Sequence, residues 1–281
     1  MNACRIAVPC AVILVWVALS GRVAQAHPPP FFWMTDLSSD RRVGAEVTLG
    51  NSELIVDAMP IVAGSVFGEI AINRRFSLVL RVPFAHVRYS NFADPDTEIA
   101  ATVLGNAGAG IKFLGASAPR RGTQMHYGLD AYVHAPTASD GVEDAFALAT
   151  AGALTLPDSG RYAVDATTLR VRGSVRYEGK TAFFQGDLGV DHRLLDGDDY
   201  TALVIGLGAG IVLSPYFAVL TEVILQTDVF EDDRDLLPTL DIGMRYHSPT
   251  QMAGLRLHLP FADEYRDANA IGLAVEIGVR F

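Results

Sequence analysis

The residues of this chain that could do chemistry are mainly charged side chains within segments of alternating apolar and polar residues. In these segments the charges take the phase opposite to the large apolar residues, so they share one face of an extended strand. They are Arg81, Lys112, Arg170, Arg172, Arg176, Arg245, Arg256 and Arg280, with Glu46, Glu69, Asp130, Asp187, Glu222, Asp241 and Glu276. Because a charged side chain in hydrocarbon is costly, the sorting predicts one wet face and one lipid-facing face.

We single out a lumen charge cluster, which comprises Arg170, Arg172, Arg176, Asp130, Asp187, Glu222, Arg245, Arg256 and Glu276. Two interpretations of this cluster stay open. It is either an ion-pair network that fills and stiffens a narrow interior, or a filter whose opposed charges create a transverse field that sorts solutes. In the second interpretation the three arginines on one strand would orient an anionic or phenolic end of a solute.

A few residues outside this cluster are of types that could take part in catalysis. His86 and Ser90 share an outward phase, as a lipid-hydrolysing pair would, but no oxyanion hole or third member accompanies them. His126 and His134 point inward. We therefore predict no enzyme, no catalytic residue, no cofactor and no dedicated metal site.

Acidic groups recur between the segments, most densely at Asp196, Asp198, Asp199 and 231–233. Carboxylates suit Ca²⁺ or Mg²⁺, but neither group has the full spacing of a calcium loop. We expect solvated acidic loops that bind divalent cations loosely. The formal net charge of −10 and the absence of a basic stripe argue against a nucleic-acid partner.

The elements that must position these charges are strand-like segments of about 10 to 15 residues, separated by turn signals. We count twelve, at 43–50, 61–73, 75–89, 100–114, 123–136, 166–178, 180–192, 200–213, 216–229, 235–247, 250–261 and 269–281. Tight turns and long acidic loops alternate strictly between them, as in an outer-membrane barrel. The predicted fold is all-β: a closed antiparallel transmembrane β-barrel of about 12 strands, with short periplasmic turns and longer acidic external loops.

The two ends of the chain complete this organisation. Residues 1–26 have the pattern of a secretory signal peptide and contain both cysteines. We predict a periplasmic lead-in at 27–42, a mobile tail with a packed aromatic residue, and an outer-membrane barrel at 43–281. The last strand should pair with 43–49 to close the barrel, and Phe281 should serve as an assembly signal for the barrel assembly machinery.

The segment 140–165 is too long for a plain hairpin, and we expect a helix or a strand extension at the external rim. As a functional element it would be an apolar lid over the lumen. The other interpretation is that the flanking strands simply continue beyond the bilayer. The candidate lid residues are Phe146, Leu148, Leu154 and Leu156.

Two motifs and the terminal strand that ends at Phe281 resemble those of the meta-pathway-of-phenol-degradation family of outer-membrane transporters. The motifs are the strand at Gly105–Gly115, led by Gly105 and Asn106, and the stretch Gly128–Gly141, whose turn at Pro136 and Thr137 departs from the family's pattern at Ala138. The resemblance implies uptake of small, often hydrophobic molecules. Three hypotheses follow: a barrel that passes small solutes, a structural or surface-interaction barrel without significant transport, and a lipid-modifying enzyme.

Overall fold

The computed structural model describes residues 30–32, 34–38, 40–52, 59–91, 94–120, 122–138, 141–195, 199–229, 236–261 and 271–281. The predicted signal peptide at 1–26 lies outside the described residues. Most of the acidic loop residues also lie outside them, among them Asp196, Asp198, 231–235 and 263–267.

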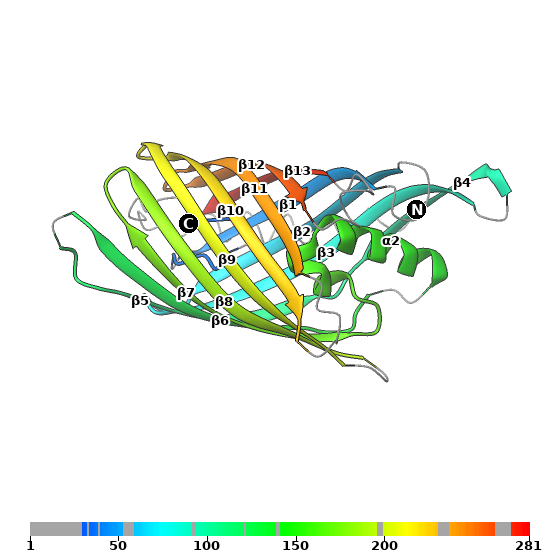
Figure 1. The fold of residues 1–281 in the computed structure, drawn as a ribbon, viewed down its shortest axis with the longest axis horizontal. Coiled ribbons are helices and arrows are strands. Elements are labelled where there is room, and N and C mark those ends of the chain that lie inside the picture. The colour runs from blue at the N-terminus through cyan, green and yellow to red at the C-terminus, as the bar shows by residue number, and fades with distance from the viewer. Residues whose placement is uncertain are drawn as a thin grey trace.

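The described residues form one antiparallel sheet of 13 strands (Figure 1). They are β1 Arg42–Ser52, β2 Met59–Ala71, β3 Phe76–Asn91, β4 Asp94–Leu104, β5 Gly108–Ala116, β6 Gln124–His134, β7 Thr167–Glu178, β8 Ala182–Leu194, β9 Tyr200–Ser214, β10 Phe217–Asp228, β11 Leu236–His247, β12 Gln251–Pro260 and β13 Gly272–Arg280.

The sheet closes into a barrel through its first and last strands. β1 pairs with β13, with Val43 opposite Val279 and Leu49 opposite Leu273, and β1 also pairs with β2. The predicted closing pair is therefore confirmed. Closure gives backbone partners to both edges, which hydrocarbon could not provide.

β4 and β5 share one position in the barrel, so the 13 strands make 12 positions around the wall. The C-terminal half of β3, from Phe84 to Asn91, pairs with β4, and its N-terminal half, from Phe76 to Arg81, pairs with β5. The prediction of one continuous strand at 100–114 is wrong at 105–107. The reason lies opposite, at Pro83, which has no N–H to donate to the ladder. Asp94, predicted in a loop, begins β4 instead.

The two faces of the wall are those predicted from the alternation. On the outward face Leu207 is 59% exposed, whereas Glu222 on the inward face is 0% exposed. The same contrast separates Val171 from Arg172 on β7. All the predicted inward charges except Arg81 are buried.

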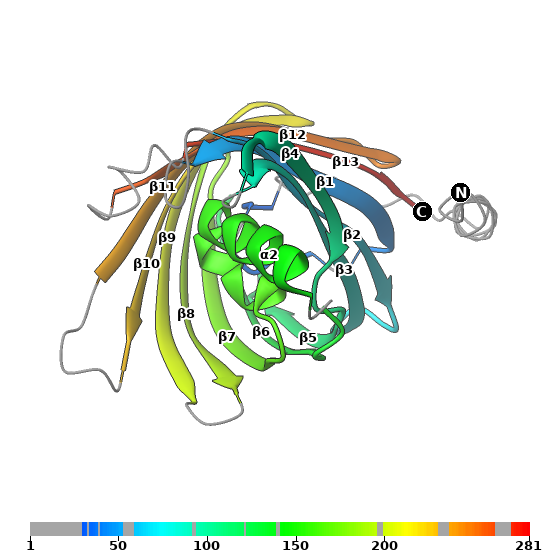
Figure 2. The ribbon, with the colours of Figure 1, turned by 90° about the vertical axis from the view of Figure 1, so that its right-hand side faces the viewer.

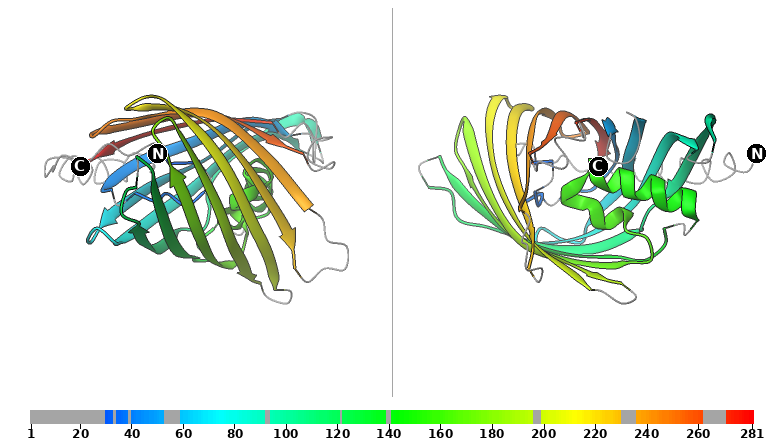
Figure 3. Two further views of the ribbon diagram at one scale, coloured as in Figure 1. Left: turned by 60° about the vertical axis from the view of Figure 1, so that its left-hand side comes forward. Right: turned by 45° about the vertical axis from the view of Figure 1, so that its right-hand side comes forward.

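The barrel has a short-turn end, which carries the connections at 72–75, 179–181, 215–216 and 248–250. At the opposite end, which we call the helix end, lie helix α2 Val142–Leu154 and the 3-10 helix η1 Leu156–Tyr162. Figure 2 shows α2 within the ring of strands, and Figure 3 shows it from two further sides. The strand-overhang interpretation of 140–165 is therefore wrong. Among the described residues, no helix is long and apolar enough to cross a membrane.

The local sequence favours this helix. Alanine and leucine dominate 145–154, and both have high helix propensity. Glu143 and Asp144 lie in the first turn, where negative charge complements the helix dipole. Pro157 follows the helix and stands at the start of η1.

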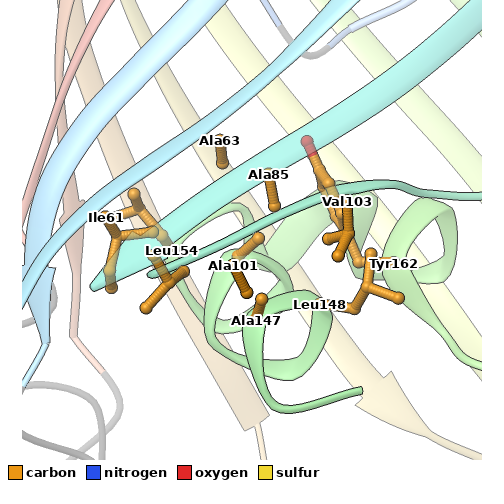
Figure 4. Close-up of a cluster of buried hydrophobic side chains, with 11 residues drawn as sticks. Ile61, Ala63, Ala85, Ala101, Val103, Ala147, Leu148, Leu154 and Tyr162 are labelled. Carbon is orange, nitrogen blue, oxygen red and sulfur yellow. The ribbon is translucent and has the colours of Figure 1, made fainter. Parts of the chain in front are cut away.

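One side of α2 packs on the inner face of the wall (Figure 4). Ala147, Leu148, Ala151 and Leu154 contribute to a buried apolar cluster, and Tyr162 of η1 completes it on the helix side. The wall side consists of Ile61, Ala63, Ala85, Val87, Ala101 and Val103. The small wall residues allow the helix to lie close to the strands, which explains why β2 to β4 carry alanine at inward positions.

Candidate functional site in the lumen

The N-terminal segment, by which we mean the described residues of 30–40, lies inside the barrel in its short-turn half. This position corrects the expectation of a mobile periplasmic tail for these residues. Their contacts are with inward side chains of β6, β8, β10 and β11, far away in sequence. The lumen face of the wall is therefore occupied by protein over this part of its length.

Apolar residues of the segment fit into a recess on β8 to β10. Phe31 packs edge-on against Phe183, with 5.3 Å between ring centroids. Phe31 and Met34 share a buried cluster with residues of β8, β9 and β10. The recess exists because β9 carries glycine at its inward positions. A Cβ at Gly208 would lie 2.5 Å from the Phe31 ring and 2.8 Å from the Met34 sulfur.

Polar contacts hold the middle of the segment. Thr35 donates its backbone N–H to Asp187 over 2.6 Å and its hydroxyl to Asp130 over 2.9 Å. Gln185 donates its amide to the Thr35 carbonyl over 2.7 Å. The two carboxylates of the predicted charge cluster therefore bind the chain's own backbone and hydroxyl, which accounts for their position deep in the lumen.

Both ends of the segment are also bound. Arg245 donates to the carbonyls of Pro30 and Phe31, at 2.8 and 3.1 Å, and Glu222 accepts the backbone N–H of Phe32.

Toward β1, Asp36 forms an ion pair with Arg42 over 2.5 Å, and Asp40 forms one with Arg280 over 2.5 Å. Burial opposes ionisation of Asp36, but the charges of Arg42 and Lys112 outweigh it, so the pKa of Asp36 lies well below its usual range.

The arginines of the charge cluster have partners within the wall. Arg170 binds Asp191 through two nitrogens, at 2.9 and 2.6 Å, and Arg172 lies 3.6 Å from the same carboxylate. Arg176 lies over the Phe183 ring at 4.2 Å from its centroid. Arg245 pairs with Glu276, and Arg256 with Glu46. Of these contacts, the pair of Arg245 and Glu276 joins two members of the predicted cluster, whereas the contacts of the other arginines are with residues outside it.

Sequence reasoning missed Asp191, which holds two of the three clustered arginines. It lies on the inward phase of β8, so the alternation could have identified it. Sequence reasoning also missed Thr35 and Asp36, because their segment has no strand periodicity. The inward glycines of β9 gave the one available signal that something bulky packs there.

Asn106 is a further residue whose role sequence reasoning missed. Its side chain anchors the helix end to the wall. Its side-chain amide donates to the carbonyls of Ala163 and Ala166, at 2.6 and 3.1 Å. Its side-chain oxygen accepts the backbone N–H groups of Thr137 and Ala138. All four hydrogen-bonding positions of the amide are used. The two motifs that carried the family resemblance therefore meet at this residue.

The predicted lid residues lie inside the ring rather than across its mouth. Leu148 and Leu154 are fully buried against β2 to β4, and Phe146 packs at the edge of the same cluster. Leu156 is the first residue of η1, and its side chain lies outside the described part of the structure. The helix therefore narrows the lumen from one side and leaves the other side open.

Cavities remain above and below the N-terminal segment. A central cavity of about 90 Å³ lies between the segment and the helix end, lined by Thr35, Arg161 and Arg170 among others. A larger one of about 360 Å³ lies between α2 and the wall. At the short-turn end a third cavity of about 340 Å³ borders Leu37 and Ser38. The N-terminal segment thus lies between the central cavity, which borders Thr35, and the cavity at the short-turn end, which borders Leu37 and Ser38.

The structure describes part of the residue set considered for lipid hydrolysis. His86 Nδ1 lies 2.7 Å from Thr102 Oγ1, across the outward face, and the Ser90 side chain is not described. His126 and His134 are buried toward the lumen, with His126 3.4 Å from Glu178. Within the described ranges, no group of three or more His, Cys, Asp or Glu residues is placed to hold a metal ion.

Comparison with known proteins supports the fold. No family model and no curated protein sequence matches the chain. The barrel is similar to the crystal structure of an outer membrane channel from Pseudomonas putida F1, with a TM-score of 0.63 and 10% identity over 91% of this chain and 100% of that chain. At this identity the likeness shows the fold: a closed 12-position barrel of the outer-membrane type.

Two further barrels are more distant. The NanC porin has a TM-score of 0.49 and 8% identity over 86% of this chain and 98% of that one. The translocator domain of the autotransporter NalP from Neisseria meningitidis has a TM-score of 0.48 and 10% identity over 86% and 88%. The likeness to the phenol-degradation transporter family stays a resemblance of motifs, supported at the level of fold.

Proposed function

We propose that this protein is an outer-membrane channel for small solutes, and that its own N-terminal segment closes the lumen. The observation that carries the proposal is the position of that segment. It lies inside the lumen against β6, β8, β10 and β11, it belongs to no strand, and its backbone continues into the wall at β1. A barrel built only as a scaffold would not require a separate chain segment between two wider cavities.

The contacts of the segment suit reversible displacement. They combine one apolar recess with hydrogen bonds to wall carboxylates and to Arg245. Each such hydrogen bond can be exchanged for one to water, so its net contribution is about 0.5 to 3 kcal/mol. The barrel wall does not depend on the segment, because the backbone ladders close without it.

The solutes we propose are small and hydrophobic or aromatic, with a polar or anionic end. Positive side chains of β7 lie along the central cavity, and α2 presents an apolar surface at the helix end. An apolar surface at the entrance gives a first binding step for the body of such a solute. The arginines then offset the cost of moving its anionic end through the lumen.

A structural or surface-interaction barrel is the second candidate, and the buried ion pairs favour it. Arg170 pairs with Asp191 on the adjacent strand, and Arg256 pairs with Glu46 across β13, so neither pair needs a solute to explain it. Under this alternative the N-terminal segment is a permanent filling of the lumen, and the barrel conducts nothing.

Single-channel recording in planar bilayers separates the two candidates. We expect brief current steps from the refolded mature protein and larger, longer ones after deletion of residues 30–38. Gly208→Val should have a similar effect, because its side chain would occupy the space of the Phe31 ring. Gly173→Val is the matched control, since a Cβ there meets nothing closer than 3.9 Å. Folded barrels that stay silent in all three variants would refute the channel and leave the structural role.

A further inference from the structure

The cavity of about 360 Å³ at the helix end has the composition of a small-molecule site. It lies between α2 and η1 on one side and the inner face of β8 to β11 on the other. Its volume falls within the range of about 300 to 1,000 Å³ that ligand pockets occupy. Its lining combines apolar side chains with several polar ones, among them Ser159, Arg193, Tyr200 and Gln226.

The helix side of the cavity is a flat apolar surface. Ala145, Ala149, Gly152 and Ala153 lie on one face of α2, because their spacing follows the helical period. This face is distinct from that of Ala147, Ala151 and Leu154, which packs on the wall. Ala149 is exposed even though it lies inside the barrel. A helix that is apolar on both sides is expected to be covered on both, and among the described residues η1 covers the second side only in part, at Gly152.

On the wall side, Gln226 is an independent sign of a ligand. Its side chain is 4% exposed and lines the cavity, and among the described residues its Oε1 has no hydrogen-bond partner. Buried polar atoms are satisfied in nearly all native proteins, so an orphan atom on a residue that lines a cavity indicates a missing partner. Gln226 Oε1 would accept a hydrogen bond from an O–H or N–H group of the ligand.

Arg193 supplies the charge of the site. Its guanidinium donates to Ser159 Oγ over 2.6 Å and lies over the Tyr200 ring at 4.9 Å. These contacts fix the side chain at the cavity wall. Of the residues described as lining this cavity, Arg193 is the one with a formal charge. The site therefore favours an anion, and a guanidinium suits a carboxylate in particular.

We propose that this cavity binds a small carboxylate that has a flat apolar body and a hydroxyl group. The body lies on the alanine and glycine face of α2, the carboxylate accepts from Arg193, and the hydroxyl donates to Gln226 Oε1. The proposal rests on the proposed function in one respect, since a solute that enters at the helix end reaches this cavity before the N-terminal segment. It uses neither that segment nor the lumen charge cluster.

The test is a binding titration of the refolded mature barrel in detergent micelles, in which saturation-transfer NMR measures the binding of each probe. The probe is 4-hydroxybenzoate, compared with benzoate, which lacks the donor, and with 4-hydroxybenzyl alcohol, which lacks the charge. We expect the neutral probe to bind roughly tenfold more weakly or worse, since hydrogen bonds to charged groups are the stronger ones.

Two variants assign the binding to this cavity. Gln226→Leu should weaken 4-hydroxybenzoate roughly threefold to tenfold, the loss of one hydrogen bond, and leave benzoate unchanged. Ala149→Phe should abolish binding of both, because the ring fills the cavity without touching the packed face of α2. Gln251→Leu, at an exposed position of β12 in the short-turn half, is the matched control and should bind like the wild type.

Equal affinity of wild type and Gln226→Leu for 4-hydroxybenzoate overturns the proposal, and so does the absence of saturable binding to the folded barrel. Binding and conductance are measured separately. If the barrel binds the probe at this cavity but carries no current, the proposed binding site stands and the proposed channel function fails. If the barrel conducts current but does not bind the probe, the channel function stands and the binding site fails.

Discussion

Thr35 and Asp187 are 152 residues apart in the chain, yet the backbone N–H of Thr35 donates to a carboxylate oxygen of Asp187 over 2.6 Å. This bond joins the N-terminal segment to the wall at the middle of the lumen. Gln185, two residues before Asp187, binds the Thr35 carbonyl from the same strand. The backbone N–H and C=O groups of Thr35 are thus both bound by side chains of β8.

Asp187→Ala should loosen the N-terminal segment without unfolding the barrel, because the wall ladders do not involve this side chain. In a Met34→Cys background, we expect a water-soluble maleimide to label the buried cysteine roughly tenfold faster or more, as hydrogen bonds to a charged group contribute about 1.5 to 3 kcal/mol. Asp187→Asn, which keeps an acceptor oxygen, is the control and should label nearly like the parent. Unchanged labelling of Asp187→Ala would show that this bond does not hold the segment.

Arg170→Ala should lower the free energy of unfolding by roughly 3 to 5 kcal/mol, because it leaves Asp191 as a buried charge without its principal partner. Urea unfolding in lipid vesicles measures the loss. The double variant Arg170→Ala with Asp191→Ala should recover part of it. If Arg170→Ala alters solute flux but not the free energy of unfolding, Arg170 orients solutes and does not stabilise the barrel.

Leu148→Ser should release α2 from the wall, since Leu148 is fully buried in the cluster it forms with β2 to β4. Removal of a buried leucine side chain costs about 2 to 5 kcal/mol. Limited proteolysis should then cut within 142–154 while the barrel keeps its heat-modifiable mobility on gels. Ala149→Ser, on the cavity face, should stay resistant. Equal resistance of both variants would contradict the packing described for the helix.

Deletion of Phe281 should impair assembly in the outer membrane. Its backbone N–H donates to the Arg41 carbonyl over 3.0 Å, where the last strand meets the first, and its ring continues the outward phase of β13. The measurement is the folded fraction in outer-membrane extracts. Phe261→Ser, an exposed aromatic residue near the helix end, is the control and should assemble normally. Normal assembly of the deletion would remove Phe281 as the assembly signal.

The sequence by itself determined the barrel and the orientation of its wall. Lipid favours apolar side chains and the polar interior favours charged ones, so the types of two adjacent residues such as Val171 and Arg172 already show which face of the wall each one is on. This signal is local and recurs along each strand, which is why the closing pair of β1 and β13 followed from the pattern as well.

The tertiary structure alone decided what fills the interior. An inward Asp187 or Asp130 has the same pattern whether it faces water, another side chain or the N-terminal segment, because polar groups satisfy each other in many arrangements. The break opposite Pro83, with Asn106 anchoring η1, likewise depends on residues that meet only after the barrel closes. Alternation specifies that a face is polar, and only the folded chain specifies the partner of each polar group.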